Sequence, residues 1–276
     1  MIILFGLALV LQYYKDIGSR IIDSVFLQIF PGQSGQATKV VRDIGWFPAS
    51  YRLKPRDDNQ LSIAFRISRL ENTPIEFGLN ITQHPSPFSI LCDPDDPLWK
   101  DSLRIEINGS SLGMLNPTDF LFYTCIHGIE WKSPVDLRWI VDAHKILTQE
   151  KTNINWSRLL EQTQEKRVVL PIINTFAFLL ETFNFPIPNF VIHSLETINK
   201  QSFYQNEYSA IIAPKSIINN FRKKWFQYAR SMRMRNKTAI PNFFGFLEFI
   251  KSDWQLINVW SIPFEFLKRG RRFLSK

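Results

Sequence analysis

Cysteine is scarce in this chain, which has two among its 276 residues. Cys92 and Cys125 lie far apart in the sequence, and neither has a second Cys or a His at the spacing of a metal-binding motif. This pattern indicates neither a disulfide framework nor a zinc site. A reducing compartment fits the cysteine content best, and we expect a cytoplasmic protein.

Long apolar runs are also missing. No stretch reaches the roughly twenty apolar residues that a membrane-spanning helix needs. The apolar opening, residues 1–11, has no basic residue before it and no small-residue cleavage site after it, which argues against a signal peptide. Since this opening reads as the first strand of a sheet, the chain begins in the middle of an architecture, and the sequence leaves open whether Met1 is the natural start.

The chain has enough apolar residues to form a hydrophobic core, and its charges are unevenly distributed along the sequence. Hydrophobic residues make up 45% of the sequence, and the formal net charge is +8. Residues 215–276 hold 14 Lys and Arg against 3 acids, a net of +11, which leaves 19 basic and 22 acidic residues, a net of −3, for the rest. The basic character therefore belongs to the C-terminal part.

The opening thirty residues predict a strand, a glycine turn, a helix and a second strand. Gly6 interrupts the first apolar run, as glycine does where the backbone turns tightly. Asp23 opens the second strand, in which Val25, Leu27 and Ile29 share one face because side chains alternate with a period of two. A carboxylate beside a glycine turn and a helix N-terminus suits a metal and a nucleotide phosphate, although a surface aspartate explains the spacing equally simply.

The sheet continues after a short helix that ends at Gly45. Residues 61–70 and 75–81 predict two paired strands, and the second carries Glu76. In an antiparallel arrangement Glu76 would stand near Asp23.

Two helices with clear start signals follow, and further along the chain a third helix is predicted to be capped near Asn155. Asn116 and Pro117 begin one helix, which ends at Gly128, and residues 133–148 form the next, with Leu137, Ile140, Val141, His144 and Leu147 as its apolar stripe. Asp142 lies on a mostly apolar helix and needs a partner. Arg138, one turn back, and His127, near the end of the preceding helix, are the candidates. Such an ion pair either locks the two helices together or helps to bind a ligand.

The chain resembles the uncharacterised nucleotidyltransferase-like family of the DNA polymerase β superfamily over roughly residues 2–190. In that family a strand ending in Lys-Gly leads into a helix, a turn with an Arg and a strand with Asp-x-Asp, followed by a third acid and two helices with His-Gly and Arg-Trp-x-x-Asp. The matching positions here are Gly6, Arg20, Asp23, His127, Gly128, Arg138, Trp139, Asp142 and, more loosely, Glu76.

The resemblance implies an α+β fold, with a small mixed β-sheet and helices followed by a helical C-terminal half. It also implies transfer of a nucleoside monophosphate from an NTP to an acceptor hydroxyl. Asp23 and Glu76 would be the catalytic and magnesium-binding acids. The nucleotide-binding residues would be Gly6, Arg20, His127, Arg138 and Asp142.

Two positions depart from the family pattern. Phe5 replaces the basic residue before the glycine, and Val25 replaces the second acid of the Asp-x-Asp pair. Valine cannot ligate Mg²⁺, so the second metal site loses a ligand. The alternative function is a non-catalytic binding module.

We expect three domains: a nucleotidyltransferase-like α/β domain (1–115), a helical domain (116–200) and a basic, aromatic-rich helical tail (201–276). Within the tail, residues 221–276 mix basic and aromatic side chains, which suits an anionic membrane surface or a nucleic acid. An ordinary surface helix pair is the third interpretation. Peripheral attachment to a membrane would modify the cytoplasmic location.

Overall fold

The computed structural model describes most of the chain and divides it into two compact units, unit 1 (Met1–Ile198) and unit 2 (Asn199–Lys276). The described residues are 1–22, 24–30, 33–48, 62–66, 78–82, 97–128, 137–149, 154–166, 168–200, 205–207, 209–210, 213, 216–235, 240–254 and 256–274.

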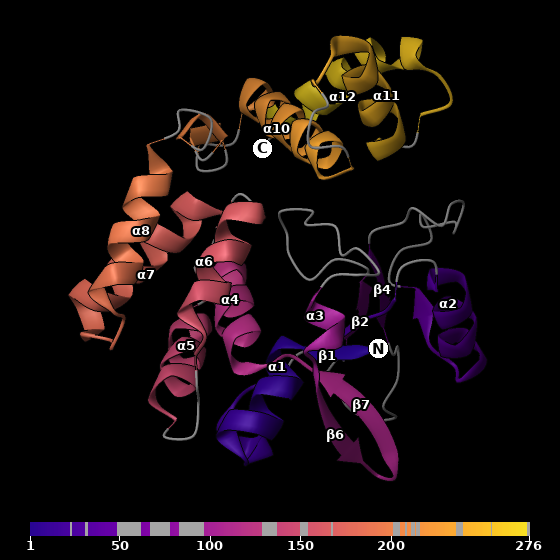
Figure 1. Ribbon diagram of the computed structural model, residues 1–276. Coiled ribbons are helices and arrows are strands. Elements are labelled where there is room, and N and C mark those ends of the chain that lie inside the picture. The colour runs from indigo at the N-terminus through magenta and orange to yellow at the C-terminus, as the bar shows by residue number, and fades with distance from the viewer. Residues whose placement is uncertain are drawn as a thin grey trace. The chain divides into compact units, whose positions relative to one another are not determined.

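Unit 1 is built on a mixed β-sheet (Figure 1). Among the described residues its strands are β1 (Ile2–Leu4), β2 (Ser24–Gln28), β3 (Phe47–Pro48), β4 (Ser62–Arg66), β5 (Gly78–Thr82), β6 (Leu103–Ile107) and β7 (Ser110–Met114), in the order β3-β4-β5-β2-β1-β7-β6. Strand β1, an inner strand of the sheet, is fully buried, antiparallel to β2 and parallel to β7. The predicted small mixed sheet is confirmed.

The chain leaves β1 through a short helix, as predicted, but the turn differs in detail. Helix α1 (Phe5–Leu9) continues into a π-helical segment, η1 (Val10–Tyr14), and a 3₁₀ turn, η2 (Ile17–Ser19). Phe5, one residue before Gly6, has the left-handed backbone, with φ of 51°. Such a φ is uncommon for a residue with a bulky side chain. The phenylalanine, which is the first residue of α1, therefore makes the turn in place of the glycine.

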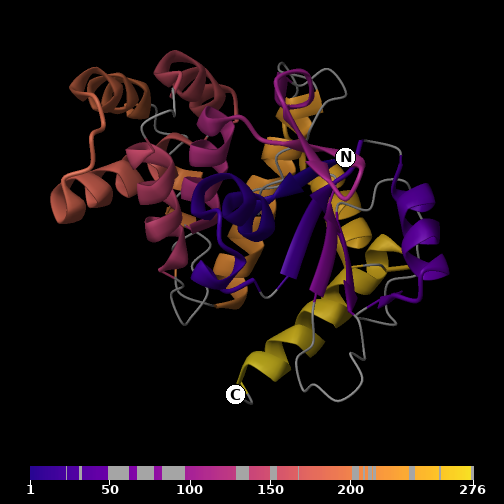
Figure 2. The ribbon, with the colours of Figure 1, turned by 90° about the horizontal axis from the view of Figure 1, so that it is seen from below.

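Helices cover both faces of β2. Val25, Leu27 and Ile29 pack with Val41 of α2 (Ser34–Asp43), so the predicted shared face is confirmed. Phe26 points the other way and meets Phe5 of α1 edge to face, with ring centroids 5.6 Å apart. Figures 1 and 2 show α2 on one side of the sheet and α1 on the other. This alternation fixes which side chains of β2 lie under which helix.

The strands next to β2 are paired differently from the expectation. The β4–β5 hairpin is antiparallel, as predicted. However, β5 lies parallel to β2, with Ser24 opposite Gly78, whereas we had expected an antiparallel neighbour. Asp23 and Glu76 precede these two strands in the sequence, and both lie outside the described residues.

The rest of unit 1 is helical. Its described helices are α3 (Pro97–Lys100), α4 (Pro117–Gly128), α5 (Arg138–Thr148), α6 (Trp156–Glu165), α7 (Val169–Phe183) and α8 (Asn189–Asn199), the last crossing the boundary between the units by one residue. Helix α4 packs against α5, α6 and α7. The predicted caps are confirmed, because Asn116 accepts from the backbone N–H of Asp119, and Asn155 accepts from that of Arg158, each at 3.0 Å.

Helix α5 buries a different face from the one predicted. The apolar residues that are buried on it are Ile140, Ala143 and Ile146. Leu137 and Val141, which we had placed on the buried stripe, are more than half exposed. Asp142 is buried, so the packed face of this helix contains a charged residue.

Unit 2 has an aromatic core of its own. Its helices are α10 (Ile217–Arg235), α11 (Phe243–Asp253), a 3₁₀ turn η3 (Val259–Ser261) and α12 (Ile262–Leu274). Tyr228, Phe246, Ile250 and Ile262 form the buried centre of these helices. No helix in the described part of the chain is long and apolar enough to cross a bilayer.

Candidate functional site

The Asp142 carboxylate is held by Arg20, which is 122 residues away in the sequence. Arg20 donates from Nε to Oδ1 and from Nη2 to Oδ2 of Asp142, both at 2.8 Å. The side chains are 13% and 5% exposed, respectively. A two-point contact of this kind fixes the plane of the guanidinium group as well as its position.

Tyr14 completes the contact from η1. Its hydroxyl donates to Oδ1 of Asp142 at 2.8 Å, so this oxygen accepts from two side chains. The π-helical segment that carries Tyr14 packs against α5. Lys15 ends that segment with φ of 60°, a left-handed cap, and η2 then leads to Arg20. The local backbone therefore presents Tyr14 and Arg20 to the same helix.

Positive charge collects around this ion pair. Arg138 lies close enough to Arg20 for the two charges to oppose each other. Lys145 Nζ stands 5.6 Å from the centre of the Tyr14 ring. Burial alone would lower the pKa of Arg20, but the hydrogen bonds and charge of Asp142 outweigh it, so the pKa is raised. We call Tyr14, Arg20, Arg138, Asp142 and Lys145 the Arg20 cluster.

Asp142 has a partner that was not predicted for it. Arg20 makes the described contacts with its carboxylate, whereas the predicted partners were Arg138 and His127. Arg138 nevertheless lies nearby, so the structure brings together three of the predicted nucleotide-binding residues. His127 lies on α4, where its side chain is not among those described. Gly6 is buried in α1.

The two departures from the family pattern are both packed into apolar surroundings. Phe5 is 7% exposed and contacts Phe26 on one face of β2. Val25 packs on the opposite face, in the cluster around Ile29 and Val41. A lysine at the first position or an aspartate at the second would place a charge in these contacts, which is unfavourable. The replacements are therefore part of the core.

The described residues do not fit a two-ion magnesium site. They contain no group of three or more His, Cys, Asp or Glu side chains that can hold a metal. The Asp142 carboxylate is already bound by Arg20 and Tyr14. The position of the second family acid is the apolar Val25, and the predicted ligands Asp23 and Glu76 lie outside the described residues.

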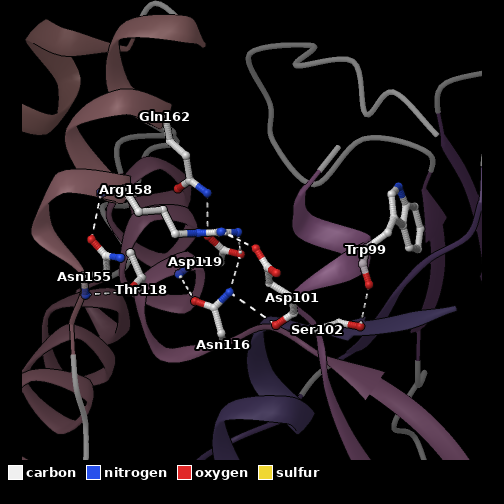
Figure 3. A network of polar contacts seen from close by, with 9 residues as sticks. All are labelled: Trp99, Asp101, Ser102, Asn116, Thr118, Asp119, Asn155, Arg158 and Gln162. Atoms are coloured by element: carbon white, nitrogen blue, oxygen red, sulfur yellow. Dashed lines mark hydrogen bonds and ion pairs between the residues drawn. The ribbon is translucent and has the colours of Figure 1, made fainter. Parts of the chain in front are cut away.

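A second arginine–carboxylate cluster joins α4 to α6 (Figure 3). Asp119, which is 0% exposed, accepts from Arg158 Nε at 3.0 Å and Nη2 at 2.8 Å. It also accepts from Gln162 Nε2 at 2.5 Å and Asn116 Nδ2 at 2.7 Å. Arg158 reaches Asp101 as well, which follows α3. Burial would lower the pKa of Arg158, but the two carboxylates raise it.

This Asp119 cluster was not predicted from the sequence, although both of its helix caps were. Asn116 and Asn155 give local signals, whereas Asp119 and Arg158 are 39 residues apart and meet only when α4 and α6 pack. Every oxygen of Asp119 is bonded, and Arg158 lies between two carboxylates. Such a cluster holds helices in place.

The comparisons with known proteins agree with the fold. Residues 1–184 match a family described as uncharacterised nucleotidyltransferase, so the chain belongs to that family, and its α+β fold is nucleotidyltransferase-like. Membership of such a family implies an NTP as a substrate in general. No curated protein and no solved structure shows a significant match to the chain.

Proposed function

We propose that the protein binds an NTP through the Arg20 cluster and transfers its nucleoside monophosphate to an acceptor hydroxyl. The observation that carries the proposal is the partly buried guanidinium of Arg20, fixed by Asp142 while Arg138 and Lys145 stand close by. The family supplies the class of ligand. The described members of the cluster are three cations and one carboxylate, and this surplus of positive charge suits a polyphosphate.

Arg20 has hydrogen-bonding capacity beyond its ion pair. A guanidinium carries five N–H groups. Among the described residues, three of them are used, two toward Asp142 and one toward the Ile21 carbonyl at 3.2 Å. The other two are available for phosphate oxygens. Because Asp142 has already fixed the plane of the group, less conformational entropy is lost when an anion binds.

In the proposed reaction the acceptor hydroxyl oxygen bonds to the α-phosphorus. The bond from the α-phosphorus to its bridging oxygen breaks, pyrophosphate leaves, and the hydroxyl proton passes to a base. Asp23 and Glu76 are the candidate carboxylates for this chemistry. Gly6 and His127 remain candidate nucleotide-binding residues on the family pattern.

A second candidate function is nucleotide binding without turnover. The packing of Val25 favours it, because the apolar cluster under α2 takes the place of a catalytic acid. Nucleotidyl transfer needs an acceptor, whose identity the proposal does not specify, whereas binding without turnover needs none. Both functions require the same phosphate contacts at Arg20.

Calorimetric titration of the full chain with each NTP and Mg²⁺, together with a pyrophosphate-release assay, tests the proposal. We expect binding that Arg20→Gln weakens by about tenfold to a hundredfold, as for loss of a hydrogen bond to a charged group. Arg104→Gln, at an exposed arginine of β6, is the matched control and should leave the affinity unchanged.

The two readouts separate the two functions. Binding with pyrophosphate release supports nucleotidyl transfer, and binding alone supports the second candidate. If no NTP binds, or if Arg20→Gln and Arg104→Gln behave alike, the Arg20 cluster is only an ion pair between η2 and α5.

A further inference from the structure

The described apolar side chains of helix α12 in unit 2 fall into two groups, one packed inside the unit and one exposed. On the inner face, Ile262 is buried in the aromatic core, and Phe266 meets Phe221 of α10 with ring centroids 5.6 Å apart. Trp260, in the preceding turn η3, and Phe264 and Leu267 of α12 are 86%, 77% and 64% exposed.

Two of these exposed residues share one side of the helix, and the third lies just before it. Phe264 and Leu267 are three positions apart on α12, which places their side chains on the same side. Trp260 lies in η3, which runs directly into α12. We call Trp260, Phe264 and Leu267 the outer face of α12. Exposed apolar side chains scattered singly need no explanation, but three large ones in a row indicate a contact surface. Ile257, just before η3, is 96% exposed and adds an aliphatic side chain near its start.

The sequence of unit 2 is strongly basic. Residues 199–276 hold 15 Lys and Arg against 4 acids, a net of +11. Helix α12 itself carries Lys268, Arg269, Arg271 and Arg272 against Glu265. Lys268 is 62% exposed, and its contact with Glu265 is long, at 3.8 Å. The helix thus combines exposed apolar bulk with a cationic end.

We infer that unit 2 docks on an anionic membrane surface through the outer face of α12. A helix of 13 residues is about 20 Å long and lies in the plane of the interface rather than across it. Trp260, Phe264 and Leu267 enter the boundary between head groups and acyl chains, while the basic residues attract anionic lipid. This surface is separate from the Arg20 cluster, so it is independent of the proposed function.

The aliphatic members favour lipid over nucleic acid. A single-stranded nucleic acid also attracts cations and stacks on aromatic rings. Leu267 and Ile257 have no flat ring for stacking, yet both are largely exposed. Hydrocarbon accommodates aliphatic and aromatic side chains alike.

Vesicle flotation of the full chain tests the inference. The probe is phosphatidylcholine vesicles with and without phosphatidylserine. We expect partitioning onto the anionic vesicles that falls in high salt, because screening weakens the attraction. Phe264→Gln with Leu267→Gln should reduce partitioning by about tenfold or more, since each removes a side chain worth more than 1.4 kcal/mol on burial. Phe190→Gln, at an exposed phenylalanine of α8, is the matched control and should change nothing.

Three results would overturn the inference. The first is equal partitioning of the double variant and the wild type. The second is that the wild type binds a fluorescent single-stranded oligonucleotide but no vesicles, and that the double variant loses the oligonucleotide binding. This result would assign the surface to nucleic acid. The third is the absence of both kinds of binding together with a lower melting temperature of the double variant, which shows that the surface is covered by the protein itself.

Discussion

The two arginine–carboxylate clusters of unit 1 use the same residue types in opposite proportions. In the Asp119 cluster one arginine, Arg158, lies between two carboxylates, and the buried carboxylate accepts from three different side chains. In the Arg20 cluster one carboxylate, Asp142, pairs with Arg20, while Arg138 acts on the charge of Arg20 and Lys145 lies over the Tyr14 ring. Among the described residues, carboxylates therefore outnumber cations in the first cluster, and cations outnumber carboxylates in the second.

This difference separates a structural role from a binding role without reference to sequence motifs. A buried charge whose hydrogen-bonding groups are all satisfied contributes to the position of its helices and offers nothing to a ligand. A buried arginine that keeps free N–H groups in a cationic neighbourhood can bind an anion. The comparison predicts that the two clusters respond differently to the same kind of substitution.

The largest effect is expected at Asp119. Asp119→Ala leaves Arg158, Gln162 and Asn116 without their shared acceptor, and removal of one partner of a buried pair costs about 3–5 kcal/mol. Urea unfolding of the full chain, followed by tryptophan fluorescence, measures this loss. Asp101→Ala, at the more exposed partner, should cost about 0–1 kcal/mol. Equal losses for the two variants would break the comparison.

The next largest effect on stability is expected at Val25, which stands where the family pattern has its second acid. Val25→Asp places a carboxylate against the apolar cluster of Ile29 and Val41, and the free energy of unfolding should fall by about 1–3 kcal/mol. Val40→Asp, at an exposed position of α2, is the control with little expected change. If Val25→Asp instead creates or raises pyrophosphate release, the rest of the catalytic site is intact.

A smaller effect distinguishes two adjacent tyrosines. Tyr14→Phe removes one hydrogen bond to Asp142 and should lower the free energy of unfolding by about 0.5–1.5 kcal/mol. The hydroxyl of Tyr13 is buried without a hydrogen-bond partner among the described residues. Tyr13→Phe should therefore be neutral or slightly stabilising in the same urea assay. A greater loss at Tyr13 than at Tyr14 would contradict the assigned contact.

The smallest effect is on the pH dependence of stability, and it is expected only above pH about 10. Burial raises the pKa of both Tyr13 and Tyr14, and at Tyr14 the charge of Asp142 adds to the shift. The neutral phenols therefore favour the folded state below pH about 10, and this contribution is lost progressively at higher pH. Urea midpoints at pH about 8 and 11 should decline less for Tyr14→Phe than for the wild type. An identical decline would mean that Tyr14 titrates normally.

Local signals predicted local structure well. The capping residues Asn116 and Asn155 act within one turn of their helices, so the starts of α4 and α6 could be predicted from the sequence. The shared face of Val25 and Ile29 follows from strand alternation alone. These features depend on neighbours a few residues away.

Features that depend on distant residues were predicted less well. Strand β5 runs parallel to β2, and this direction depends on the path of the connections between the strands. The hydrophobic pattern of each strand does not specify that path. The partner of Asp142 comes from a turn 122 residues earlier. Helix α5 buries Ile140 and Ala143 rather than Leu137 because the neighbouring elements, not hydrophobicity alone, choose the face. The catalytic roles of Asp23 and Glu76 stay predictions.

The distance in sequence between Arg20 and Asp142 has a consequence for how the site comes into being. A fragment that ends before α5 contains the sheet and Arg20 but not the carboxylate that orients it. The proposed anion recognition at this point would thus be a property of the assembled unit and not of its N-terminal strands. A polyphosphate bound to Arg20 favours the docked position of α5 over its undocked one, so ligand affinity and helix docking are thermodynamically linked.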